Sequence, residues 1–365
     1  MTAATLCVAL AVSCTGKQVK GVSKGSKSKF DSLSYAIGTD IVSSLKMQMR
    51  DVPFDYKAAC EALEVAALDK KPMVVDGDTL THDRAVGMLR EYMMTKRAQR
   101  ASEIKARKAE ADSIALAAGQ TPEPVSDDFA DPEMFESESE RMTLSYALGT
   151  DIGNSLKNVQ FPLQATWVIE AITDGVDGKG RMTREEASDY LDYYFNKKIP
   201  AENRAESEKW LSKIERKSGV KKTESGILYK IEKAGDEEVK AVDDRDVVKV
   251  HYKGTLPDGT VFDASRYEDM PAERQEMMRR YRPDNYDEND PVEFPLNRVI
   301  RGWTEGMKLV GKGGKITLWI PSELAYGERA SMPIGPNRAL RFDVELIDVI
   351  PHAAPAKKAD EQSAE

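Results

Sequence analysis

Side chains capable of acid–base or metal chemistry are sparse in this chain. It has 365 residues but only three histidines and three cysteines. His82, His251 and His352 lie too far apart for a local zinc motif, and three cysteines cannot build a disulfide framework. The glycine-rich segment 311–315 (GKGGK) lacks Walker spacing and precedes a predicted strand, so we interpret it as a tight turn. We expect no metal and no cofactor.

The composition limits the classes of partner and the architecture. The formal net charge is -9, which argues against a general nucleic-acid binder because phosphate neutralisation needs concentrated Lys and Arg. With 41% hydrophobic and 32% charged residues, the chain is not a multi-pass membrane protein. Its length predicts two or three domains.

The first residues have the pattern of an export signal. Residues 2–13 (TAATLCVALAVS) carry no charge and are too few to span a bilayer. The sequence Ala11-Val12-Ser13-Cys14 resembles a bacterial lipobox, so we predict a signal peptide over 1–14 with Cys14 as the lipid-bearing residue; a plain cleaved signal is the alternative. Residues 15–30, rich in Gly, Ser and Lys, predict a flexible tether. The protein is thus expected in a bacterial cell envelope, either lipid-anchored (on the periplasmic side of the outer membrane) or periplasmic.

An internal repeat organises the first two thirds of the chain. Residues 32–46 (SLSYAIGTDIVSSLK) and 143–157 (TLSYALGTDIGNSLK) share eleven of fifteen positions. Each segment is followed by a second helix-like stretch and by a threonine, Thr81 or Thr183, suited to cap a third helix. We therefore predict two all-α modules, copy 1 (31–118) and copy 2 (141–217).

The third helix of each copy is predicted to be long, over 84–118 and 184–216, with Pro200 interrupting the second. An acidic, proline-containing linker is expected at 119–140. Cys60, in the second helix of copy 1, is interpreted as a core thiol.

From residue 223 the pattern changes to short strands and turns. Strands are expected at 227–233, 247–256, 261–263, 292–295, 315–320 and 340–349, with one helix over about 300–309. The fold class predicted for the chain is therefore α+β, with tandem helical modules followed by an antiparallel sheet wrapped around one short helix over 218–350. Residues 351–365 are expected to form a disordered tail.

Several linked motifs carry a family resemblance. The segments VHYKGTLPDGTVFDAS, VIRGWTEGMKLVGKGGKITLWIP, LAYGERA and IGPNRALRFDVELIDV resemble, in order, the catalytic domain of FKBP-type peptidyl-prolyl isomerases. The repeated SYALG and SLK motifs resemble the N-terminal helical domain of the macrophage infectivity potentiator-like branch, whose helices intertwine two chains. The resemblance implies that the two copies pair either in a homodimer or with each other as an intramolecular pseudo-dimer.

The resemblance also implies a proline-binding slot and its residues. Tyr252, Asp263 and Tyr326 stand at the positions of the family's polar catalytic groups. Val292 stands where the family often has an aromatic residue, so one wall of the slot is expected to be lower. The implied substrate-binding residues are Phe262, Val299, Ile300, Trp303, Ile334 and Phe342.

The implied activity is cis–trans rotation of Xaa-Pro bonds in exported polypeptide clients without covalent chemistry, combined with chaperone-like assistance to folding. The rival is a non-catalytic proline-peptide-binding or chaperone scaffold on the same fold. An insertion at 267–290 departs from the family, and its first part, 271–281, has the pattern of a short helix. We expect this helix to be either a flap or exosite that narrows substrate choice, or a surface elaboration packed away from the slot.

Overall fold

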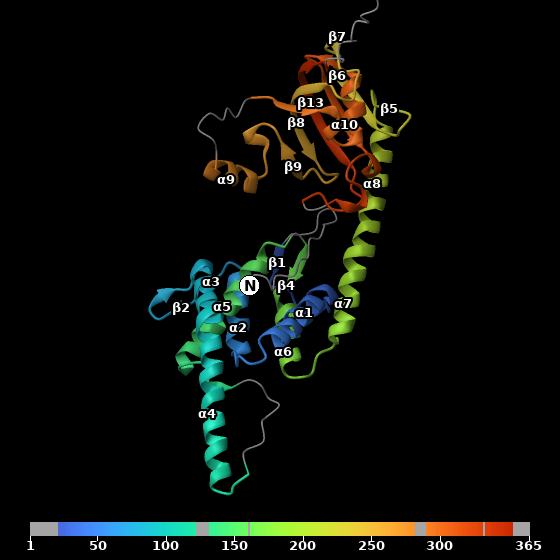
Figure 1. Cartoon of the computed structure of the whole chain (residues 1–365). Coiled ribbons are helices and arrows are strands. Elements are labelled where there is room, and N and C mark those ends of the chain that lie inside the picture. Colours follow the sequence, from blue (N-terminus) through green and yellow to red (C-terminus); the bar gives the residue numbers. More distant parts are fainter. Residues whose placement is uncertain (1–20, 122–130, 160, 282–289, 331–332, 353–365) are drawn as a thin grey trace, which may run out of the picture. The chain divides into compact units, whose positions relative to one another are not determined.

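The computed structural model describes residues 21–121, 131–159, 161–281, 290–330 and 333–352. These residues form two compact units, which divide between Lys197 and Lys198 (Figure 1). The signal peptide and Cys14 lie outside the described residues, as does the predicted tail beyond 352. No helix in the described ranges is both long enough and apolar enough to cross a bilayer.

The N-terminal unit contains copy 1 and the first three helices of copy 2, in matching order (Figure 1). Thr81 and Thr183 cap the third helix of each copy as predicted, with Thr183 forming a capping box with Glu186. In both copies a π-helical turn, Tyr92–Lys96 or Tyr194–Lys198, follows the start of the third helix, and Pro200 stands in the first turn of the next helix. The helices are α1 (Ser32–Gln48), α2 (Tyr56–Ala67), α3 (His82–Glu91) and α4 (Arg97–Ala117) in copy 1, and α5 (Glu138–Lys157), α6 (Ala165–Val176) and α7 (Arg184–Tyr193) in copy 2.

Helices of the two copies cross in the N-terminal unit. The first helix of each copy packs on the second helix of the other, so that α1 lies against α6 and α2 against α5. Equivalent hydrogen bonds fix both crossings: the Asp55 N–H donates to Ser145 Oγ at 2.8 Å, and the Gln164 N–H donates to Ser34 Oγ at 2.8 Å. The apolar faces of these short helices are therefore buried by the other copy.

Two segments expected to be loose are packed on the helices. Within the predicted tether, β1 (Gly21–Ser23) pairs with β4 (Pro162–Gln164) in parallel, and the Trp167 Nε1–H donates to the Lys29 carbonyl at 3.0 Å. Within the predicted linker, Phe135 is buried and stacks on Tyr92, with ring centroids 5.3 Å apart. Backbone pairing and aromatic burial order these parts, which composition alone describes as flexible.

Cys60 is buried on α2, as the core-thiol interpretation requires. Burial raises the pKa of its thiol to about 11. The protonated thiol is a poor nucleophile at neutral pH, so Cys60 has the properties of a packing residue.

The C-terminal unit is the predicted antiparallel sheet around a short helix. Seven strands of the unit form one sheet in the order β10-β8-β13-β12-β6-β5, with β9 paired to β8, and α10 (Arg301–Gly306) covers one face (Figure 1). β7 and β11 pair with each other in a separate two-stranded sheet. Three short strands, β5, β7 and β11, were not predicted. The strands are β5 (Lys221–Lys222), β6 (Leu228–Lys233), β7 (Asp236–Lys240), β8 (Val247–Thr255), β9 (Val261–Ala264), β10 (Val292–Pro295), β11 (Gly311–Lys312), β12 (Lys315–Ile320) and β13 (Leu340–Ile350).

One helix from the end of the repeat region belongs to this unit. Residues of α8 (Ile199–Glu215) pack against β6 and β12, where Ile214, Leu228 and Trp319 form a small buried cluster. The Ala339 N–H donates to Ser207 Oγ at 2.9 Å, which joins α8 to the start of β13. The insertion contributes α9 (Ala272–Tyr281), at the position predicted for its helix.

Candidate active site

Aromatic rings from four elements meet above the sheet beside α10. Trp303 on α10 lies edge-on to Tyr252 of β8 and to Phe342 of β13, with ring centroids 5.3 Å apart in both pairs. Phe262 of β9 meets Phe342 in the same way at 5.6 Å. Trp303 is 4% exposed and Phe342 is 3% exposed, so these rings belong to a buried aromatic cluster.

The Asp263 carboxylate lies beside these rings and is held from several sides. The Tyr252 hydroxyl donates to Asp263 Oδ2 at 2.6 Å, and the Ala264 N–H donates to Oδ1 at 3.0 Å. Burial, together with the hydrogen bond to Asp263, raises the pKa of Tyr252 well above its usual value. Tyr252 therefore stays protonated through the physiological range and keeps donating to the carboxylate.

Two polar groups near the aromatic cluster have hydrogen-bond donors without a protein acceptor among the described residues. The Tyr326 side chain is 48% exposed, and burial followed by the nearby Asp263 charge raises the pKa of its phenol. Among the described residues, no group pairs with the Tyr326 hydroxyl or accepts the backbone N–H of Ile300, which precedes α10. Both can donate to a bound polypeptide carbonyl.

The structure brings together the remaining residues implied by the resemblance. Val299, Ile300 and Ile334 are partly buried and pack on the same core as the rings. Phe294 was missed: its ring lies 5.6 Å from Trp303 and 5.8 Å from Tyr252. The alternation Val292, Glu293, Phe294 in β10 was the available signal, because alternate residues of a strand share a face.

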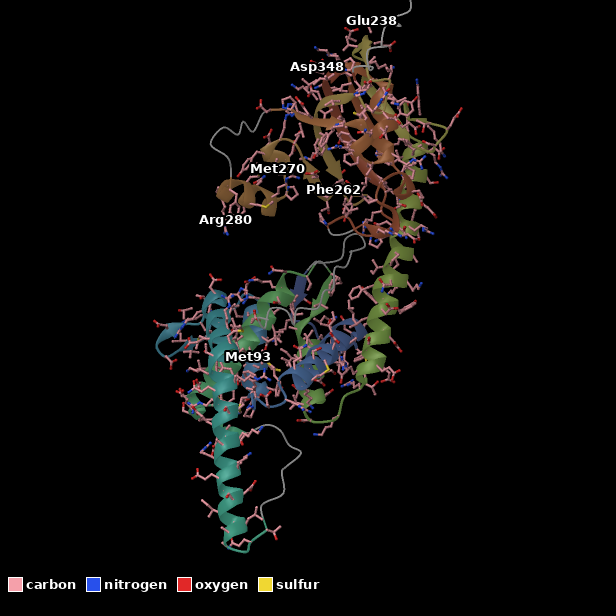
Figure 2. All side chains as sticks on the ribbon, in the orientation of Figure 1. Met93, Glu238, Phe262, Met270, Arg280 and Asp348 are labelled. Atoms are coloured by element: carbon pink, nitrogen blue, oxygen red, sulfur yellow. The ribbon has the colours of Figure 1, made fainter. Side chains whose placement is uncertain are left out.

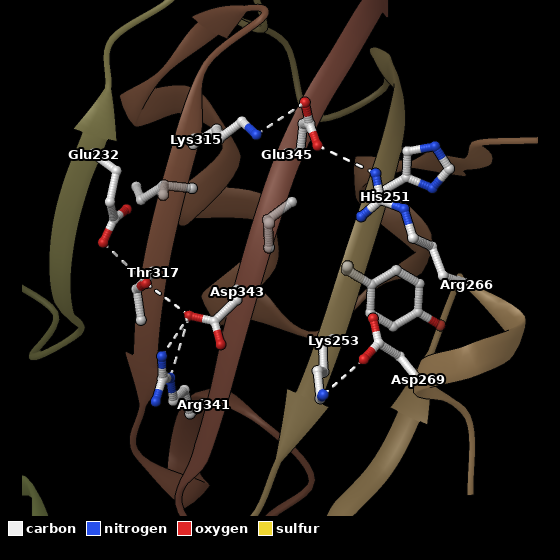
Figure 3. Close-up of a pocket in the computed structure, with 13 residues that line it drawn as sticks. Glu232, His251, Lys253, Arg266, Asp269, Lys315, Thr317, Arg341, Asp343 and Glu345 are labelled. Carbon is white, nitrogen blue, oxygen red and sulfur yellow. Dashed lines mark hydrogen bonds and ion pairs between the residues drawn. The ribbon is translucent and has the colours of Figure 1, made fainter. Parts of the chain in front are cut away.

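The opposite side of the same strands carries a hollow of about 390 Å³, lined by charged residues (Figure 3). Its charges are paired with each other: Glu345 accepts from both Arg266 and Lys315, and Lys253 pairs with Asp269 at 2.7 Å. His251 lies here and interacts with Ser265 Oγ at 3.3 Å; burial lowers its pKa, consistent with the structural role expected for it. Within the described ranges, no group of His, Cys, Asp and Glu could hold a metal.

Comparison with known proteins identifies the class that this fold and site define. Residues 238–347 match the family model described as FKBP-type peptidyl-prolyl cis-trans isomerase, and residues 141–231 match the domain amino terminal to that isomerase. The chain belongs to the FKBP-type peptidyl-prolyl cis-trans isomerases, and its reaction is the cis–trans isomerisation of Xaa-Pro bonds. The amino-terminal match covers copy 2 and not copy 1.

Bacterial relatives agree over most of their own length. The chain is 36% identical over 244 residues to FKBP-type peptidyl-prolyl cis-trans isomerase FkpA of Aeromonas hydrophila, covering 63% of this chain and 82% of that protein. It is 36% identical over 233 residues to FkpA of Escherichia coli K12, covering 59% and 77%. The probable FkpA of Neisseria meningitidis serogroup B is 39% identical over 232 residues, covering 59% and 76%.

Proposed function

We propose that the aromatic site around Trp303 is the catalytic slot and that it isomerises Xaa-Pro bonds without covalent chemistry. The observation that carries the proposal is the hydrogen bond between Tyr252 and Asp263 at the edge of the aromatic cluster. In this assignment the polar groups are Tyr252, Asp263 and Tyr326. Ile300 contributes both an apolar side chain and its backbone N–H. The side chains that enclose the proline ring are those of Phe262, Val299, Trp303, Ile334 and Phe342.

The physical task of such a slot is to bind the twisted amide better than the planar one. Rotation about the peptide bond has a barrier of about 18–20 kcal/mol because it destroys the amide resonance. Only interactions that are stronger in the twisted state lower this barrier. Aromatic walls exclude water, while donors at Tyr326 and Ile300 hold the flanking carbonyls, and Asp263 orients Tyr252 and supplies a fixed negative charge.

Replacing the polar groups tests these roles. We expect Tyr326→Phe to lower kcat/KM by about three- to tenfold, the range for losing one hydrogen bond. Asp263→Val should lower it by about tenfold or more, because it also leaves the buried Tyr252 hydroxyl without its acceptor. A protease-coupled assay on an Xaa-Pro peptide measures both. Tyr281→Phe is the matched control, because it removes the same hydroxyl from a tyrosine that is 78% exposed on α9. Full activity in Asp263→Val would refute the assignment.

We propose further that copy 1 is a second module of the amino-terminal domain type and that the chain forms an intramolecular pseudo-dimer. Complementary side chains support this pairing. Val42 and Gly153 are equivalent, since 42 + 111 = 153, the spacing of the repeated motifs. Asp55 and Gln164 donate the two equivalent hydrogen bonds, so residues of α2 and α6 correspond with an offset of 109 (55 + 109 = 164). By this offset Ala66 of α2 corresponds to Gly175 of α6 (66 + 109 = 175).

At one crossing the larger side chain is on the first helix of a copy, and at the other crossing it is on the second helix. Val42 of copy 1 fills the space at Gly175, where an added Cβ would come close to the Val42 side chain. Gly153 of copy 2 instead makes room for Ala66, where an added Cβ would lie 2.8 Å from the Ala66 methyl. Pairing copy 1 with another copy 1 would set Val42 against Ala66 and overpack the crossing. Pairing copy 2 with copy 2 would set two glycines together and leave a void.

A double-mutant cycle tests this complementarity. Gly175→Val should lower the free energy of unfolding of the N-terminal unit by about 1–3 kcal/mol, because it overpacks against Val42. Adding Val42→Gly should recover part of that loss, giving a coupling energy of roughly 1–2 kcal/mol in urea unfolding. No coupling between the two positions would contradict pairing of copy 1 with copy 2. Light scattering then measures whether the protein in solution is a monomer or a dimer. A stable dimer would exclude the intramolecular form, and a concentration-independent monomer would support it.

We propose that the protein acts on exported polypeptides in the cell envelope, where a lipid on Cys14 anchors it to the membrane. We propose no nucleic-acid partner. The support is the lipobox-like sequence Ala11-Val12-Ser13-Cys14. Mass spectrometry of the mature protein should find Cys14 as its first residue, with the added mass of a lipid. A soluble mature protein cleaved elsewhere would leave a periplasmic isomerase without an anchor.

A further inference from the structure

The insertion places a cation on the slot carboxylate. Arg274, on the first turn of α9, donates from Nη1 to Asp263 Oδ1, the carboxylate that also accepts from Tyr252. Among the described residues, Asp263 is the only partner of the Arg274 side chain, which is 42% exposed. Since a guanidinium has five N–H donors, donors remain for a ligand entering the slot.

Several contacts hold α9 in this place. Met270, just before the helix, is buried, and Asp269 pairs with Lys253 of β8 at 2.7 Å. The Gln275 side chain donates to the carbonyls of Tyr267 and Met270 at 3.0 and 3.1 Å. Figure 2 shows Met270 and Phe262 on neighbouring segments of this unit, whereas Arg280 lies at the far end of α9. The start of α9 is therefore tied to the slot, and its end is free of it.

Four other cations on α9 and the neighbouring segments are already paired. Lys253 pairs with Asp269 and Arg266 with Glu345, while Arg279 and Arg280 both pair with Glu276 on α9 itself. Arg274 alone among these cations meets a slot residue. It offsets the charge of Asp263, which would otherwise repel a substrate carboxylate, and it offers that carboxylate a forked donor.

We propose that Arg274 is a specificity-determining residue that favours Xaa-Pro segments with an acidic side chain directly before or after the proline. The proposal rests on the slot assignment made above and narrows its substrate class. An acidic neighbour would share the guanidinium with Asp263, whereas a basic neighbour would be repelled by it. The insertion thus sets a charge preference while the aromatic rings select the proline ring.

The test measures the selectivity of the full chain on short blocked peptides by exchange NMR at low salt, where charge effects are least screened. One series has Glu, Gln or Lys before the proline, and a second series has the same residues after it. In at least one series, Arg274→Gln should reduce the ratio of kcat/KM for Glu over Lys peptides by about three- to fivefold, the range of a partly exposed ion pair. Arg274→Lys, which keeps the charge, should retain most of the ratio.

Arg280→Gln is the matched control, because it removes one positive charge from the same helix away from Asp263, and it should leave the ratio within about twofold of wild type. A wild-type ratio in Arg274→Gln in both series would overturn the role of Arg274 while leaving the isomerase assignment standing. A wild-type chain that accelerates exchange of no peptide in either series would overturn the slot assignment and the selectivity together.

Discussion

Replacing Trp303 with alanine should lower the free energy of unfolding of the C-terminal unit by about 3–5 kcal/mol, the range for emptying a buried tryptophan site. The same change should reduce kcat/KM by far more than tenfold, because it removes the proposed floor of the slot, a ring that contacts Tyr252, Phe294 and Phe342. Denaturant unfolding measures the first effect and an Xaa-Pro assay at low temperature, where the variant stays folded, measures the second.

Trp319 is the matched control for this prediction. It is a buried tryptophan of the same unit but packs with Ile214 and Leu228 away from the slot. Trp319→Ala should lose a similar amount of stability while the folded protein keeps most of its turnover. Equal losses of turnover per folded molecule in the two variants would show that Trp303 contributes only to stability.

Replacing Gly149 with alanine should destabilise the N-terminal unit by about 1–3 kcal/mol or more, although alanine is the better helix former. A Cβ at Gly149 would collide with the backbone of Ala59 on α2, lying 2.7 Å from its carbonyl carbon. Backbone cannot move aside as a flexible side chain can, so α2 and α5 would have to separate. Thermal or urea unfolding of the full chain measures the loss.

Gly87 on α3 gives the opposite expectation, because an added Cβ there would meet no atom within 4 Å. Gly87→Ala should therefore stabilise its helix by about 0.5–1 kcal/mol. The sign of the effect distinguishes a glycine required by a close crossing from one that is merely tolerated. Destabilisation of similar size at both positions would contradict the helix crossing described for α2 and α5.

The fold was largely predictable because its signals are local and periodic. The repeated segments and the capping threonines indicated the helices, and the strand positions followed from runs bounded by turns. The pairing of α1 with α6 and of α2 with α5 was open, since the short helices of one copy could pack on the other copy or on another chain. The volumes at Val42 and Gly175, which favour one pairing, become meaningful only when the crossing is known.

The candidate site was predictable only where motifs carried it. Taken singly, Trp303 and Phe342 cannot be told from ordinary core residues. Their joint positions in the family motifs indicated a slot. Phe294 and Arg274 were not identified. Arg274 lies eleven residues after Asp263, in an insertion that departs from the family pattern, and the ion pair between them depends on how the insertion folds back. The packed part of the tether was missed because its order comes from β4 and α6, far along the chain.

The most direct test of the central claim is two-dimensional exchange NMR on an Xaa-Pro peptide with a small fraction of the full chain added. Uncatalysed exchange takes tens to hundreds of seconds. A slot that stabilises the twisted amide should raise the rates in both directions equally, leave the cis-to-trans ratio unchanged, and lose this effect in Asp263→Val. A rate that stays at the uncatalysed value, with the isomer ratio shifting only when the protein matches the peptide in concentration, would contradict the account and indicate a proline-binding scaffold.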